Sequence, residues 1–216
     1  MARNIRNGQR TRRENNQNRT PVLGYYIILT DGTETEQQYF DGLRNSLPDE
    51  VKGKLVLKVF NRDTKKLIAS CKEIMSLNPN YAEPWIVFDR DKVVDFDMLI
   101  RIAESESINV AWSNPCIEVW FEAYFNEMST YLDSVTCNTG FRRTFLKRTG
   151  QKYLKSNGHN YRLLSQNGSE SDAIRRAKLK HKEHLINMKN NPSEMIPCSL
   201  LYILVEEIRL KSTSQL

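Results

Sequence analysis

The chain has 216 residues, of which 39% are hydrophobic and 27% charged, and its formal net charge is +6. This composition is that of an ordinary globular protein of one domain, and it excludes a disordered chain, a collagen and a repeat array. The sequence contains no apolar run near the ~20 residues that cross a bilayer and no recognisable signal peptide, so we expect a cytoplasmic protein without membrane contact.

Residues 1–20 are polar, rich in Asn and Arg, and without periodicity, which predicts a flexible basic arm. Residues 1–19 hold six arginines against one glutamate, a charge of +5. Cationic segments neutralise phosphates and release counterions, although a charge run is often only a solvated surface. Arg10, Arg12 and Arg13 are therefore candidate contacts to a nucleic-acid backbone.

The folded part begins near Pro21, and its first half alternates between strand and helix patterns. Strand patterns cover residues 22–30, 54–60, 85–88 and 108–112, and helical patterns cover residues 35–46, 65–77 and 96–103. Such alternation predicts an α/β fold with a mainly parallel sheet and helices on both faces.

The second half looks mainly helical. Asn114 is predicted to be the N-cap and Pro115 the first residue of a helix that runs from 116 to about 125. Beyond Asn126 no strong strand pattern is present, and residues 173–188 and 197–210 are expected to be helices. We thus divide the chain into the arm at 1–20, an α/β core at 21–125, and a mainly helical C-terminal part at 126–216 that packs on the core.

A second basic stretch lies in this C-terminal part. Between residues 139 and 182 there are twelve Lys or Arg residues against Glu170 and Asp172. Nucleic acid is again the partner that this charge favours. The candidate contacts are Arg142, Arg143, Lys147 and Arg148.

Three aspartates follow predicted strands. Asp31 ends the first strand, and Asp89 and Asp91 follow the third with one residue between them. In an extended chain residues two apart point the same way, and carboxylates gathered on one face repel unless a cation lies between them. Hard oxygen ligands suit Mg²⁺ or Mn²⁺, and the carboxyl ends of parallel strands are where open α/β sheets bind ligands.

Each acidic residue also has an ordinary structural interpretation. Aspartates are common where a strand becomes a loop, and Asp-Gly at Asp31 is a frequent turn pair. Glu36 and Glu118 lie near predicted helix starts, where negative charge is favourable through the helix dipole. The acidic residues thus become a site only in combination.

The combination resembles the RloB-like family, which is related to TOPRIM domains and found beside ATPase partners in bacterial defence and restriction loci. The segment ILTDGTETEQQYF resembles the family's first motif, FDRD the second, and SNPCIEVWFEAYF the third. Tyr153 and Lys155 in KYLKS, the AIRRAK segment and NPSEMIPCSLLYILVEEI also look like family features, so the resemblance covers nearly the whole chain. Asp31 departs from the family, which generally has glutamate there.

The resemblance implies a TOPRIM-like fold and a nuclease that uses Mg²⁺ or Mn²⁺ against RNA or DNA, together with an RloA-like ATPase partner in antiviral defence. Asp31, Asp89 and Asp91 would be metal ligands or the base, Glu36 and Glu118 additional catalytic carboxylates, and Lys155 a contact to phosphate.

Two other functions stay open. Asp31 is one methylene shorter than glutamate and reaches roughly 1.5 Å less far, which is consistent with a degenerate site in a protein that only binds nucleic acid or a partner. A phosphatase with Asp89 as nucleophile would need a later acidic pair, for which Glu206 and Glu207 are the candidates.

Overall fold

A five-stranded sheet forms the centre of the protein in the computed structural model, which describes residues 23–31, 34–52, 54–91 and 93–213. The strands follow the order β2-β1-β3-β4-β5, and all neighbouring pairs are parallel except β4 and β5. Their bounds are β1 (Gly24–Asp31), β2 (Leu55–Arg62), β3 (Glu83–Asp89), β4 (Asn109–Asn114) and β5 (Cys198–Ser199).

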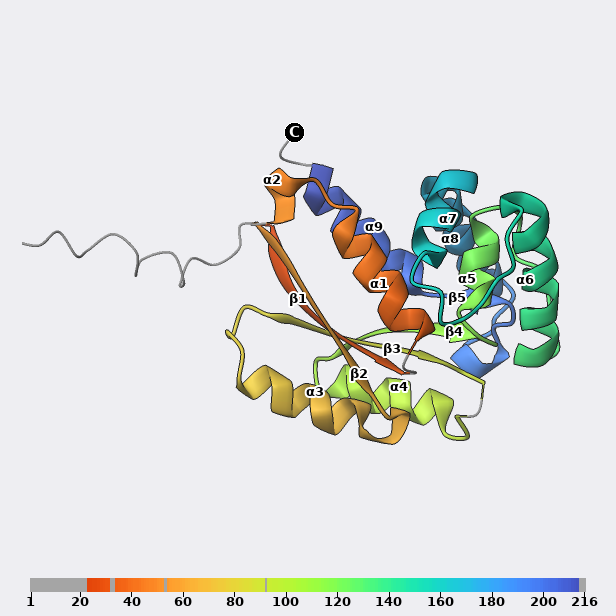
Figure 1. Cartoon of the computed structure of the whole chain (residues 1–216). Coiled ribbons are helices and arrows are strands. Elements are labelled where there is room, and N and C mark those ends of the chain that lie inside the picture. Colours follow the sequence, from red (N-terminus) through yellow and green to blue (C-terminus); the bar gives the residue numbers. More distant parts are fainter. Residues whose placement is uncertain (1–22, 32–33, 53, 92, 214–216) are drawn as a thin grey trace, which may run out of the picture.

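Helices cover both faces of the sheet, with α3 and α4 on one face and α1 and α9 on the other (Figure 1). The helices of the first half are α1 (Thr35–Asn45), α2 (Asp49–Lys52), α3 (Leu67–Ser76), preceded by the 3-10 turn η1 (Thr64–Lys66), α4 (Phe96–Ser105) and α5 (Glu118–Ala123). Those of the second half are α6 (Ser134–Thr149), α7 (Asn160–Asn167), α8 (Glu170–Ile186), η2 (Pro192–Glu194) and α9 (Leu201–Thr213).

The side chains of β1 divide the core into two layers. Ile27 and Leu29 belong to the cluster under α3 and α4, whereas Tyr26 and Ile28 belong to the cluster under α1 and α9. Successive strand residues point to opposite faces, so a strand with helices on both sides is apolar throughout. The predicted α/β fold, with a mainly parallel sheet flanked by helices, is confirmed.

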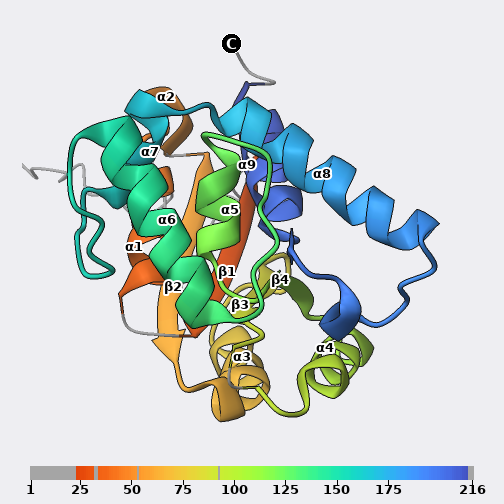
Figure 2. The same cartoon turned by 90° about the vertical axis from the view of Figure 1, so that its right-hand side faces the viewer.

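The helices after residue 126 belong to the same core as the sheet. Phe141, Leu164 and Leu204 lie in one buried cluster with Tyr26 and Trp120. Figure 2 shows α5 between α6 and α8. None of the helices in the described ranges is both long and apolar enough to cross a membrane.

Two local expectations were wrong. Asn114 is the last residue of β4 and caps no helix, because its side-chain amide donates to the carbonyl oxygens of Pro192 and Ser193 at 3.1 and 3.2 Å. The Asn114–Pro115 peptide is cis, and α5 begins at Glu118. The expected helix from residue 197 begins only at Leu201, because the chain first forms β5 beside β4.

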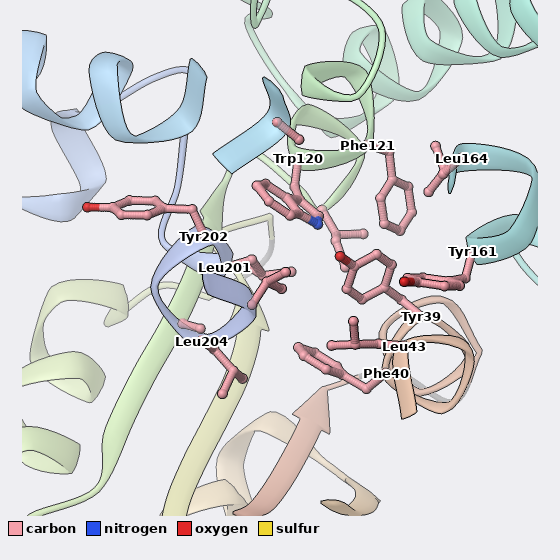
Figure 3. Packing of buried hydrophobic residues seen from close by; sticks show 14 of the residues in the cluster. Tyr39, Phe40, Leu43, Trp120, Phe121, Tyr161, Leu164, Leu201, Tyr202 and Leu204 are labelled. Carbon is pink, nitrogen blue, oxygen red and sulfur yellow. The ribbon is translucent and has the colours of Figure 1, made fainter. Parts of the chain in front are cut away.

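The packing of Tyr39 joins α1 to α5 and α7. Its ring lies 5.5 Å from that of Phe121 and 5.4 Å from that of Tyr161, and its hydroxyl is 2.8 Å from the hydroxyl of Tyr124. Figure 3 shows Tyr39 between these helices, with Trp120 on the side of α5. Because Glu36 lies one turn before Tyr39 on α1, this packing fixes Glu36 relative to the start of α5.

Candidate active site

A cleft of about 990 Å³ opens beside the carboxyl ends of β1 and β3. Its described lining has seven acidic side chains against two lysines, so it repels an anion unless a cation is present. The acidic lining residues are Asp31, Glu34, Glu36, Asp63, Asp89, Asp91 and Asp95, and the lysines are Lys65 and Lys155.

The sheet brings Asp31 and Asp89 to one edge. They are the last residues of β1 and β3, which are neighbouring parallel strands, and both line the cleft. The extended chain of β3 ends at Asp89, and the Asp91 N–H bonds to the carbonyl oxygen of Pro115, beyond the end of β4. Strand alternation therefore does not direct Asp91, although Asp91 still lines the cleft.

Asp89 lies among other carboxylates. Its Oδ2 accepts a hydrogen bond from the backbone N–H of Ile117 at 3.0 Å, which links β3 to the start of α5. Desolvation, and then the charges of Glu36 and Glu118, raise the pKa of Asp89 well above its usual range. A cation bound nearby would favour the ionised form of such a carboxyl group.

Glu36 is the second member of this group. It lies in the first turn of α1 and is only 8% exposed. Burial raises the pKa of Glu36 to about 8, with further contributions from Glu118 and Asp31, while backbone hydrogen bonding and Lys155 act in the opposite direction. Glu36 thus connects Asp31 electrostatically with the deeper carboxylates.

Glu118 is the most deeply buried of the three, with 0% exposure. Its Oε1 accepts a hydrogen bond from the Tyr153 hydroxyl at 3.0 Å and lies 3.3 Å from Lys155 Nζ. Its Oε2 is buried and has no hydrogen-bond partner among the described residues. Buried polar atoms nearly always have a partner, so this oxygen points to a ligand or water that completes it.

Lys155 and Asp91 have partners of their own. Lys155 is 44% exposed on the cleft wall, and its pKa is raised because Glu118 and Asp89 outweigh the opposing effect of desolvation. It therefore neutralises the carboxylates as well as facing the cleft. Asp91 Oδ1 accepts a hydrogen bond from Ser134 Oγ at 2.5 Å, at the start of α6.

The predicted nucleic-acid contacts are placed only in part. Arg142, Arg143, Lys147 and Arg148 are exposed on α6, and Arg148 also donates to Asn126 Oδ1 at 2.8 Å. Arg142 lies roughly 12 Å along the helix from Ser134, given 1.5 Å per residue. Arg10, Arg12 and Arg13, with the rest of the predicted arm, lie outside the described residues, as does Gly32.

The donor set suits a hard cation, although the carboxylates do not form a closed cage. Within the described ranges, no three His, Cys, Asp or Glu side chains are arranged to hold one metal ion together. Mg²⁺ commonly takes one or two carboxylates, several waters and substrate phosphate oxygens. Asp89 and the unpartnered Oε2 of Glu118 fit that mode of binding, with Glu36 beside them.

Comparison with known proteins identifies the family. The family model described as RloB-like protein matches residues 26–208. The chain belongs to the RloB-like family. No curated protein and no solved structure matches it. The matched range contains all six predicted catalytic positions of this RloB-like chain, from Asp31 to Lys155.

The role of Tyr153 was missed in the sequence. Residues 151–153 are outside helices and strands, and Tyr153 is buried two residues before Lys155. In an extended segment such a spacing puts both side chains on one side. That spacing was the available signal, but only the fold shows that both reach the same oxygen of Glu118.

Proposed function

We propose that the protein is a nuclease that hydrolyses phosphodiester bonds of RNA or DNA with Mg²⁺ or Mn²⁺. The observation that carries the proposal is Glu118, a fully buried carboxylate with one oxygen held by Tyr153 and Lys155 and the other without a partner among the described residues. Asp89 and Glu36, which line the acidic cleft, interact electrostatically with it.

Asp89, Glu118 and Glu36 would hold the metal, with Asp31 and Asp91 at the cleft wall as further carboxylates. When bound, such an ion neutralises a phosphate, activates water and stabilises the leaving oxygen. The Ile117 N–H orients Asp89, and Tyr153 and Lys155 orient Glu118. These fixed hydrogen bonds keep the carboxylates in place before substrate arrives.

The charge of the cleft supports metal-dependent binding as well as metal-dependent chemistry. With seven acidic side chains against two lysines, its described lining disfavours a polyanion on its own. The exposed arginines of α6 lie outside the cleft and suit contacts to the phosphate backbone, which position a substrate without reading its sequence. On this proposal the cation recruits the scissile phosphate and α6 holds the flanking strand.

The family resemblance adds the biological setting of the proposal, which is cytoplasmic antiviral defence with an RloA-like ATPase partner. The second candidate is a degenerate module that binds nucleic acid or its partner, and the observation in its favour is Asp31 in place of the family's glutamate. For the phosphatase, Glu207 does not complete a site, because it contacts Tyr26 and Lys211 near the other end of the sheet.

The test is cleavage of tRNA, single-stranded RNA, single-stranded DNA and plasmid with Mg²⁺ or Mn²⁺, with and without the ATPase partner. Glu118→Gln and the Asp89→Ala, Asp91→Ala double variant are expected to be inactive. Glu122→Gln is the matched control, because Glu122 is one turn further along α5 and bonds to Ser129 and Tyr131. Failure of the wild type to cut any substrate would favour the binding module.

A further inference from the structure

The ring of Tyr153 is fixed by aromatic neighbours from two helices. Its centroid lies 4.8 Å from that of Phe141 and 5.4 Å from that of Phe145, both on α6, and 6.4 Å from that of Phe121 on α5. Such packing restricts the rotamer of a buried ring. The position of the Tyr153 hydroxyl is therefore set by how α6 packs on α5.

This hydroxyl determines which oxygen of Glu118 is available. Glu118 Oε1 receives the Tyr153 O–H at 3.0 Å and lies 3.3 Å from Lys155 Nζ. Both of these groups contact the same oxygen of Glu118. The other oxygen, Oε2, has no hydrogen-bond partner among the described residues. The Tyr153 hydroxyl is the donor in the bond to Oε1, because a carboxylate oxygen accepts.

The two partners of Oε1 differ in rigidity. Lys155 is 44% exposed on a flexible side chain, whereas Tyr153 is buried and packed. A carboxylate that must present one chosen oxygen is oriented mainly by its rigid partner. Partners of this kind behind metal ligands typically contribute about 10- to 100-fold to metal affinity.

We propose that Tyr153 is a positioning residue that holds Glu118 with Oε2 turned to the cation, so that α6 packing tunes metal affinity. This inference rests on the proposed function. It assigns to Tyr153 a role that acts through Glu118, without contact to substrate. Removal of the hydroxyl leaves the ring packing in place and frees Glu118 to rotate about its side-chain bonds.

The test is calorimetric titration of the full chain with Mn²⁺. Tyr153→Phe is expected to weaken binding about 10-fold. Tyr131→Phe is the matched control, because the Tyr131 hydroxyl also donates to a glutamate at 3.0 Å, but to Glu122. Tyr131→Phe is expected to bind Mn²⁺ as the wild type does.

Activity supplies a second readout. Raising Mn²⁺ above the weakened dissociation constant is expected to restore cleavage by Tyr153→Phe, which damage to the fold would not allow. Equal Mn²⁺ affinity of Tyr153→Phe and wild type would overturn the positioning role and leave the proposed function standing. Absence of Mn²⁺ binding by the wild type would overturn both.

Discussion

The backbone N–H of Ile117 donates to Asp89 Oδ2 at 3.0 Å, and this bond joins the end of a central strand to the residue before α5. Glu118, the next residue, is thereby brought beside Asp89, which lies 29 positions earlier in the chain. The pairing places two carboxylates from separate motifs in one group, where desolvation and then the charges of Glu36 and Glu118 raise the pKa of Asp89. A cation relieves that repulsion.

Asp89→Asn is expected to reduce cleavage at least about 100-fold, because loss of the negative ligand removes several kcal/mol of charge stabilisation. The amide oxygen still accepts from Ile117, so the variant should not melt below wild type. Asp97→Asn is the control. Asp97 accepts a hydrogen bond from the Ser193 backbone N–H at 2.8 Å, and it is not among the residues that line the cleft. Single-turnover cleavage that falls equally in both variants would contradict the assignment.

Glu36 gives the metal-free protein a defined pH dependence. Its pKa is about 8 in the folded chain against a usual 4.5, so between these values the unfolded state releases a proton that the folded state keeps. Stability is therefore fully present below pH 4.5 and falls as pH rises toward 8. In EDTA, Glu36→Gln should melt about 5 °C or more above wild type at pH 8 and close to it at pH 4.5. A difference in melting temperature between the two proteins that stays constant from pH 4.5 to 8 would contradict the burial of Glu36.

Gly42 lets α7 approach α1. A Cβ at this position would lie 2.4 Å from Tyr161 Cβ, so Gly42→Ala must displace α7. The expected loss is about 1 to 3 kcal/mol in the free energy of unfolding, as for overpacked sites. Gly158→Ala is the control, because a Cβ there meets no described atom within 4 Å. Urea unfolding with equal midpoints for both variants would show that α1 and α7 are not packed in this way.

Exposed arginines on α6 are expected to contribute to binding of nucleic acid through phosphate contacts. The Arg142→Ala, Arg143→Ala variant should weaken binding of all sequences alike and reduce the slope of log affinity against log salt by about 0.7 to 0.9 for each phosphate that is no longer neutralised. Lys72→Ala serves for comparison, since Lys72 pairs with Glu106 at 2.7 Å on the α3 and α4 side. An unchanged salt slope in the double variant would remove α6 from the proposed interface.

Local patterns in the sequence predict β1 to β4, because these strands are mainly apolar or alternate between apolar and polar residues, and each is followed by a helix. Asp31 and Asp89 follow from the rule that parallel strands end at one edge. Asn114 was misread because its partners, Pro192 and Ser193, are distant in sequence. With two residues, β5 is too short to show any periodicity. The hydrogen bond from the Tyr153 hydroxyl to Glu118 depends on the packing of α6 against α5, which no local pattern reveals.

The most direct test of the metal centre is electron paramagnetic resonance of Mn²⁺ mixed with wild type, Glu118→Gln and Glu122→Gln. Both variants remove a buried carboxylate from the same helix, but only Glu118 interacts with Asp89, whereas Glu122 bonds to Tyr131. The expected result is bound Mn²⁺ in wild type and Glu122→Gln, released by EDTA, with its loss in Glu118→Gln. Full Mn²⁺ binding by Glu118→Gln would contradict the central claim.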